Sequence, residues 1–189
     1  SVEKQFRMEA GAELIIYGLD DIQGDTLIIC EGELDALALE TAGCPSVVSV
    51  PNGAPAVTSS HYEAQFHYLL SAEVLLQPLK KIILAVDSDE PGKKLAYELA
   101  RRLGSERCYR VEWSGGCKDA NDVLMSHGPA VVRECIAHAY PWPIQGIING
   151  NDLMPGMETM YDNGMERGVS TGWRSIDDHY TIRPGEFTI

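Results

Sequence analysis

The chain has 189 residues, of which 44% are hydrophobic and 23% are charged, so it can form one ordinary domain with a core plus an additional segment. Its formal net charge of -13 argues against a stand-alone nucleic-acid-binding protein, because contacts to phosphates need Lys and Arg. An acidic pocket that binds nucleotides through bridging metal ions stays compatible with this charge.

The cysteines and the chain ends bear on compartment and completeness. Five cysteines, an odd number without CxxC spacing, predict reduced thiols in a reducing, intracellular compartment. No apolar run reaches membrane-spanning length, and residues 1–10 do not resemble a signal peptide. The chain begins without Met and ends at residues 187–189 within a predicted strand, so we expect a fragment of a longer protein.

Strands and helices are predicted to alternate along the first half of the chain. In order, we expect a strand over 13–17, a buried strand over 26–30, a helix over 33–42, a strand over 46–50, a turn-rich loop over 51–55 and a helix or helix pair over 58–76. The first strand is interpreted as part of the tail of a preceding subdomain, residues 1–24.

The same alternation continues around a central strand. We expect that strand over 81–86, a helix over 93–103, a strand over 108–113, a short helix entered through the polar cluster 118–122 and a helix over 129–139. This order indicates right-handed crossovers and a mostly parallel α/β sheet, with its functional loops at one edge.

A change in composition at the proline-containing stretch 140–143 predicts an extended segment that ends the α/β domain, residues 25–143. Residues 144–167 are interpreted as a linker with an amphipathic helix over 152–163, whose methionines we expect to pack on a partner surface. Residues 168–189 are expected to begin a second domain.

Acidic residues follow two of the predicted buried strands. Asp87 and Asp89 follow the central strand, one residue apart, so an extended chain turns both side chains to one side. Glu31 follows the strand over 26–30, and neighbouring parallel strands would bring it close to Asp87. Paired carboxylates suit a hard cation such as Mg²⁺. Capping of the following helix is the alternative role for Asp87 and Asp89.

Three motifs, at residues 28–37, 87–92 and 118–122, resemble in this order those of a TOPRIM (Rossmann-like) domain. The closest resemblance is to the primase-helicases of bacteriophage type and their organellar relative Twinkle. Residues 171–177 and 183–189 resemble the lead-in to the RecA-like helicase domain of that family. Its phosphate-binding loop would follow the last residue, so we expect no NTPase activity from this chain.

The resemblance implies metal-dependent nucleotidyl transfer. In such domains Asp87 and Asp89, with Asp119, would hold Mg²⁺ or Mn²⁺, while Glu31 would act as a metal ligand or general base. Lys118 would offset charge on the phosphates. An ion pair between Lys118 and Asp119 at the helix start is the structural alternative. The weaker candidates, for which helix capping is a rival role, are Asp35, Asn121 and Asp122.

The implied function is a DNA primase that makes RNA primers in DNA replication as part of a primase-helicase. Its partners would be a single-stranded DNA template, nucleoside triphosphates and, through the linker, other subunits of a ring helicase, with no membrane. The compartment would be a phage-infected or bacterial cytoplasm, or an organelle. The fragment alone is expected to make few or no primers.

Three other functions stay open at this point. The domain would be a non-catalytic spacer that supports a ring helicase, another TOPRIM enzyme such as a topoisomerase or nuclease, or a phosphoacceptor signalling domain. The retained acids Glu31, Asp87 and Asp89 count against the spacer. The helicase-like tail disfavours the second alternative, and the position of the acid pair on a later strand disfavours the third.

Overall fold

The computed structural model describes residues 12–54, 63–144, 146–148, 150–164, 167–183 and 185. The chain divides into two compact units, residues 1–144 and residues 145–189, and each is described by itself. Within the described residues, no helix has the length and apolar character needed to cross a bilayer.

A five-stranded sheet forms the centre of the first unit, with the strand order β2-β1-β3-β4-β5. The strands are β1 (Thr26–Cys30), β2 (Val47–Ser49), β3 (Lys81–Ala85), β4 (Cys108–Arg110) and β5 (Tyr140–Pro141). The first four pair in parallel, and β5 pairs antiparallel with β4. The mostly parallel α/β fold predicted from the sequence is confirmed.

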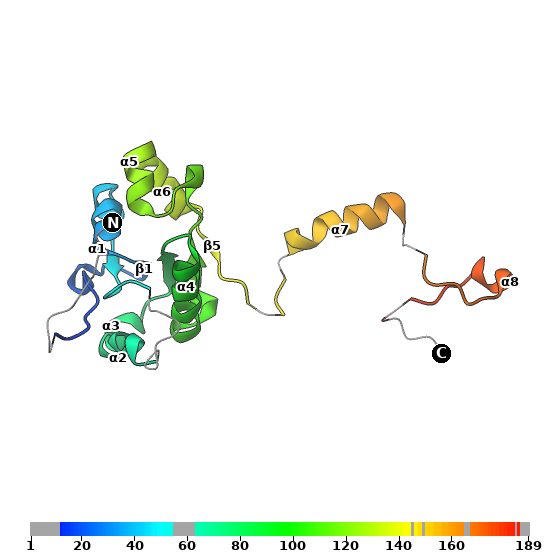
Figure 1. The fold of residues 1–189 in the computed structure, drawn as a ribbon, viewed down its shortest axis with the longest axis horizontal. Helices are drawn as coiled ribbons and strands as arrows, with labels where there is room; N and C mark the ends of the chain where they lie inside the picture. The colour runs from blue at the N-terminus through cyan, green and yellow to red at the C-terminus, as the bar shows by residue number, and fades with distance from the viewer. Residues whose placement is uncertain are drawn as a thin grey trace, which may run out of the picture. The chain divides into compact units, whose positions relative to one another are not determined.

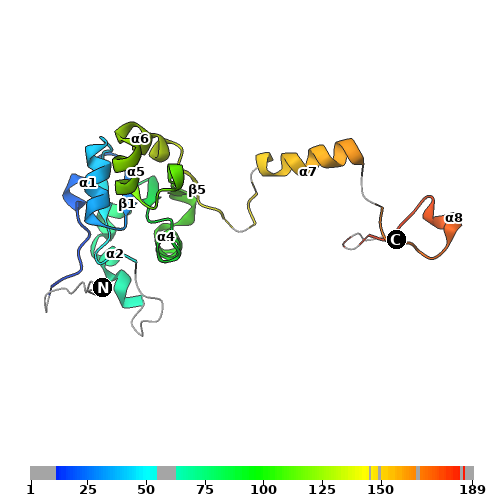
Figure 2. The same cartoon turned by 45° about the horizontal axis from the view of Figure 1, so that its top comes forward.

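Helices cover both faces of this sheet. Figure 2 shows α1 (Glu33–Thr41), α5 (Ala120–His127) and α6 (Pro129–Ala137) side by side on one face. The opposite face carries α2 (His67–Ser71), α3 (Glu73–Leu76) and α4 (Glu90–Leu103), with α2 and α3 across β1 from α5 and α6 in Figure 1. Short 3-10 turns complete the unit at Leu19–Asp21, Glu63–Phe66, Ser105–Arg107 and Ser114–Gly116.

The alternation of side chains along β1 separates the two cores. Ile28 and Cys30 pack with the first group of helices, whereas Leu27 and Ile29 pack with the second. All four side chains are buried, which explains why the strand reads as an unbroken apolar run. The same applies to β3, so both strands lie inside the sheet and their ends are held in place by packing from both faces.

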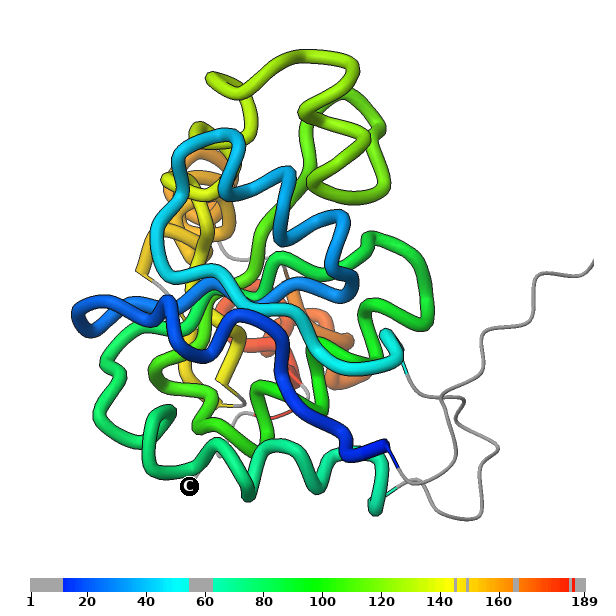
Figure 3. Tube along the Cα trace, turned by 90° about the vertical axis from the view of Figure 1, so that its left-hand side faces the viewer, coloured from blue at the N-terminus to red at the C-terminus, as the bar shows by residue number. Residues whose placement is uncertain are grey.

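Several predicted boundaries differ from the structure. Residues 13–17 were predicted as a strand, which is wrong: only Tyr17 forms an isolated antiparallel bridge, to Ser49, as the segment runs beside β2 in Figure 3. A single bridge leaves most of the segment without a ladder. Conversely, the stretch predicted only as extended includes β5, because Trp142 N–H donates to the carbonyl of Cys108 at 2.8 Å and holds it against β4.

Smaller differences concern where elements begin and end. The predicted strands 46–50 and 108–113 are shorter in the structure, as is the helix 129–139, whereas α4 begins three residues before the predicted Lys93. The helical stretch 58–76 is divided into a 3-10 turn, α2 and α3. Residues 58–62, Pro55 and the predicted strand at 187–189 lie outside the described residues.

The second unit contains α7 (Gly150–Asn163) and α8 (Arg174–Asp177). The helix expected over 152–163 is present and begins two residues earlier. Val169 and Ile182 form an antiparallel bridge, and Asp177 accepts a hydrogen bond from the backbone N–H of Thr171 at 2.7 Å. These contacts tie residues 169–182 into a small folded loop.

Candidate metal centre

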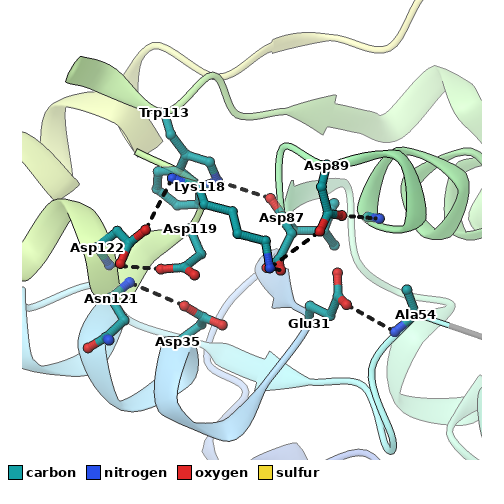
Figure 4. Close-up of polar contacts among 12 residues, drawn as sticks. Glu31, Asp35, Ala54, Asp87, Asp89, Trp113, Lys118, Asp119, Asn121 and Asp122 are labelled. Carbon is teal, nitrogen blue, oxygen red and sulfur yellow. Dashed lines mark hydrogen bonds and ion pairs between the residues drawn. The ribbon is translucent and has the colours of Figure 1, made fainter. Parts of the chain in front are cut away.

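The register of the sheet brings the acidic strand ends together. Cys30 of β1 lies opposite Ala85 of β3, so Glu31 and Asp87 leave the same edge of the sheet from adjacent strands. The indole N–H of Trp113 donates to the carbonyl of Val86 at 2.9 Å and fixes the chain immediately before Asp87. Figure 4 shows the side chains of Glu31, Asp87 and Asp89 converging at this edge.

Lys118 lies between the two aspartates. Its Nζ is 2.6 Å from Oδ2 of Asp87 and 3.3 Å from Oδ2 of Asp89. The backbone joins the same loops, because Ser88 N–H donates to the carbonyl of Lys118 at 2.9 Å. The side chain of Asp87 is only 11% exposed, whereas that of Lys118 is 49% exposed. The ammonium thus reaches from solvent to a largely buried carboxylate.

These neighbours act on the acid–base properties of the pair in opposite ways. Burial raises the pKa of Asp87, the ion pair with Lys118 offsets part of this effect, and the nearby carboxylates of Asp119 and Asp89 raise it further. The hydrogen bond to Asp87 raises the pKa of Lys118 above its ordinary value. Lys118 therefore stays protonated and supplies the positive charge that this acidic edge requires.

Asp89 has a second contact, because its Oδ1 accepts a hydrogen bond from Gly92 N–H at 2.9 Å and caps α4. Pro91 in the first turn suits the start of a helix. The capping alternative is thus correct for Asp89, and it leaves Oδ2 to face Lys118. Asp87 is outside the helix and makes no cap.

Glu31 is held by the loop that follows β2. Its Oε1 accepts a hydrogen bond from Ala54 N–H at 3.1 Å. Its Oε2 is buried and has no hydrogen-bond partner within the described part of the chain. Burial raises the pKa of Glu31, and the charge of Asp87 adds to this effect. A buried oxygen without a partner is costly unless a cation or donor completes it.

The polar cluster 118–122 forms a second tier behind these residues. Asp119 caps α5 by accepting from Asp122 N–H at 2.7 Å, and Asn121 N–H donates to Oδ1 of Asp35 at 3.2 Å. The proposed Lys118–Asp119 ion pair is not formed, since Lys118 turns to Asp87 and Asp89. Asp122 accepts weakly from Lys118 N–H at 3.4 Å. The carboxylate of Asp35 connects α1 to α5.

The surroundings of Asp35 alter its acidity. Burial raises its pKa to about 6, against the hydrogen bond from Asn121, and the charges of Asp119, Asp87 and Glu31 act in the same direction as burial. Asp35 therefore interacts electrostatically with Glu31 and Asp87, although its direct hydrogen bond is with Asn121 at the start of α5.

The residue types at this edge fit a divalent cation, since carboxylate oxygens are the ligands that Mg²⁺ and Mn²⁺ prefer. In the described ranges, however, no group of three or more Asp, Glu, His or Cys side chains is arranged so that it could hold a metal ion. The ammonium of Lys118 occupies the place between two of the carboxylates. Asp87, Asp89 and Glu31 would hold such an ion, with the Lys118 ammonium displaced from between the two aspartates.

The sequence pattern of the Toprim-like family matches residues 28–124, which begin in β1 and end in α5 and include every candidate site residue described above. The chain belongs to the Toprim-like family.

This Toprim-like chain is also similar to two plant proteins. It is 43% identical over 203 residues to the Twinkle homolog protein, chloroplastic/mitochondrial, of Arabidopsis thaliana, covering 100% of this chain and 29% of the relative. It is 44% identical over 157 residues to the primase homolog protein of the same plant, covering 77% of this chain and 47% of the relative. The chain thus spans less than half the length of either relative.

A solved structure supports the same assignment. The primase fragment of the bacteriophage T7 primase-helicase protein superimposes with a TM-score of 0.52 at 26% identity, covering 64% of this chain and 47% of that fragment. Residues 28–124 therefore form a primase-like Toprim domain, as the motifs indicated.

Two contributors to the Toprim site were not predicted. Trp113 lies on the loop after β4 and holds Val86, and Ala54 provides the N–H that positions Glu31. Only a weak signal pointed to the second, because the turn-rich loop at 51–55 was expected at the same sheet edge. Nothing in the local sequence distinguishes Trp113 from an ordinary core residue.

Proposed function

We propose that this Toprim domain is the metal-dependent nucleotidyl-transfer site of a DNA primase that makes RNA primers. The observation that supports it most directly is the convergence of Glu31, Asp87 and Asp89 at one sheet edge, with a buried Glu31 oxygen that has no partner within the described residues. Helix capping explains neither that buried oxygen nor the position of Asp87.

Each side chain has a role in this proposal. Asp87 and Asp89 would hold Mg²⁺ or Mn²⁺ together with Glu31, and Asp119 would support them from the start of α5. The bound metal would neutralise the triphosphate and the negative charge that develops during phosphoryl transfer. Glu31, whose pKa burial raises, would accept the proton of the attacking 3′-hydroxyl.

Lys118 would change partners during the reaction. Its half-exposed side chain reaches the two aspartates. When a cation occupies that place, the ammonium would turn outward to a phosphate oxygen of the nucleotide, where a flexible point charge is effective. The second-tier residues Asp35, Asn121 and Asp122 would keep α1 and α5 aligned so that Lys118 and Asp119 stay at the edge.

The parent protein would use a single-stranded DNA template and nucleoside triphosphates, as suits a primase. Helix α7 exposes Leu153, Met154, Met157 and Met160, and apolar side chains of this kind suit packing on another subunit of a ring helicase. The likeness to a relative named chloroplastic/mitochondrial, together with five free thiols, supports an organelle with a reducing interior.

Mn²⁺ titration with paramagnetic broadening in NMR tests the metal centre in the 189-residue chain. We expect broadening centred on Glu31, Asp87 and Asp89, and its loss in the double variant Asp87→Asn/Asp89→Asn. The matched control Asp20→Asn changes an exposed acid on a distant turn and should keep the broadening. Equal responses of the wild type and the double variant would show that these acids hold no metal.

Primer synthesis then separates a catalytic domain from a spacer. In the full-length protein, the double variant should lose template-dependent formation of RNA primers while helicase unwinding is retained. If the wild type binds Mn²⁺ but the full-length protein makes no primers on any template, the non-catalytic spacer is the better function.

A further inference from the structure

A pocket lies beside the candidate metal centre, between α4 and the β4–β5 edge of the sheet. Its volume is about 560 Å³, within the range of roughly 300–1,000 Å³ typical of small-molecule sites. Asp87 and Ser88 line it, so the pocket and the acidic edge share the loop after β3. A ligand in the pocket would therefore be adjacent to the proposed metal.

Four aromatic side chains line the pocket. Tyr97 stands on α4 and is 58% exposed, and Trp142 and Tyr140 reach the pocket from the β5 side. Trp142 is fixed by its backbone hydrogen bond to Cys108, and Trp113 is fixed by its indole hydrogen bond to Val86. The floor includes the apolar side chains of Leu84, Val86 and Ala96. Such a surface accepts a flat, apolar ring system.

Cationic groups stand at the same pocket. The guanidinium of Arg110 lies 4.5 Å from the ring centre of Tyr140, and Lys93 lines the pocket while its ammonium pairs with Glu90 in solvent. The acids Asp87 and Glu112 also line the pocket, so the cations equal the acids in number. Arg110 and Lys93 would complement the phosphates of a ligand whose flat part lies on the rings.

We propose that this pocket binds the nucleobase of the incoming ribonucleoside triphosphate, stacked on Tyr97 and Trp142. The triphosphate would then extend past Asp87 towards the metal and Lys118. The proposal rests on the proposed function, because that function supplies the nucleotide and places its phosphates at the acidic edge. Stacking on rings is tolerant of base identity, so the pocket would hold any of the four bases while the template selects among them.

Tryptophan fluorescence of the 189-residue chain tests this directly. The chain has three tryptophans, so in the variant Trp173→Phe the remaining two both line the pocket. Each of the four ribonucleoside triphosphates should quench this fluorescence, and inorganic triphosphate, which has no base, should not. Alkylation of Cys117, the one cysteine that is not buried and a residue of the pocket wall, should slow with nucleotide in parallel.

Tyr97→Ala is the decisive variant, because an exposed ring can be removed without opening the core. We expect the apparent affinity for nucleotide to fall about tenfold, equal to about 1.4 kcal/mol, as for the loss of one stacked base. Lys94→Ala, on an exposed part of the same helix outside the pocket, is the control and should leave the affinity unchanged. An unchanged affinity in Tyr97→Ala would overturn the proposal.

Further measurements distinguish nucleotide binding in this pocket from metal binding at the acidic edge and from binding of the template strand. In buffer with EDTA, Asp87→Asn/Asp89→Asn should retain quenching by nucleotide although it has lost Mn²⁺ binding, and Tyr97→Ala should retain Mn²⁺ binding. Quenching by inorganic triphosphate equal to that by nucleotide contradicts stacking. Quenching and Cys117 protection by a single-stranded oligothymidylate, but not by mononucleotides, would assign the pocket to the template and overturn the proposal.

Discussion

Replacing Lys118 by Met should tighten metal binding while it weakens the metal-free fold. The variant keeps a side chain of similar length and removes the charge that lies 2.6 Å from Asp87 and 3.3 Å from Asp89. A cation entering this place must displace the ammonium in the wild type. In Lys118→Met the two carboxylates are already available.

The magnitude follows from the contacts of the ammonium. A charge-assisted hydrogen bond contributes roughly 1.5–3 kcal/mol, and a side chain that is 49% exposed favours the lower end because water screens it. We therefore expect Mn²⁺ to bind about tenfold more tightly to Lys118→Met, equivalent to about 1.4 kcal/mol. In EDTA the same variant should lose about 2 kcal/mol of unfolding free energy, since the largely buried Asp87 is left without its counter-ion.

Isothermal titration with Mn²⁺ and urea unfolding with and without metal provide the two measurements. The control Lys80→Met removes an exposed lysine that pairs with Asp25 at 3.1 Å, away from the acidic edge. It should change stability by less than about 0.5 kcal/mol and leave Mn²⁺ affinity unaltered. In full-length protein, primer synthesis by Lys118→Met should fall despite tighter metal binding, because no ammonium reaches the phosphates.

An equal or weaker Mn²⁺ affinity in Lys118→Met would refute this reasoning. It would mean that the ammonium does not compete for the cation position, and that the acids bind metal elsewhere or not at all. A tighter affinity with undiminished primer synthesis would instead remove the proposed contact between Lys118 and phosphate.

Two further predictions concern the supporting residues. Because burial raises the pKa of Asp35 from 3.8 to about 6, its folded state binds protons more readily, so stability falls as pH rises through that window. Allowing for solvent screening, we expect the free energy of unfolding of Asp35→Asn in EDTA to exceed that of the wild type by about 1 kcal/mol above pH 6 and to equal it below about pH 4. Urea unfolding across this pH range measures the difference. A gain in stability that is independent of pH contradicts the assignment. A side chain on Gly92 would collide with the backbone carbonyl of Asp87. Gly92→Ala should therefore lower the free energy of unfolding by about 2 kcal/mol or more and abolish Mn²⁺ binding. Gly156→Ala, on an open part of α7, is the matched control, and equal stability of the two variants would show that the contact is unimportant.

The amino-acid sequence alone determined the parallel core and the approximate place of the site. Residues 27–30 and 82–85 are apolar throughout because both faces of β1 and β3 are covered by helices, and this pattern is visible without a structure. Since acids follow both strands, the parallel arrangement placed Glu31 and Asp87 at one edge. The local sequence also offered the cap formed by Asp89 as an alternative, although α4 begins three residues before the predicted start.

Only the tertiary structure decided which groups touch. Whether Lys118 pairs with Asp119, its neighbour in sequence, or with Asp87 depends on how the loop after β4 folds over β3. The N–H that holds Glu31 comes from Ala54, 23 residues away, and the two-residue strand β5 exists only because β4 offers it an edge. Local patterns report what a segment can form, whereas these contacts depend on the register and on loops from distant parts of the chain.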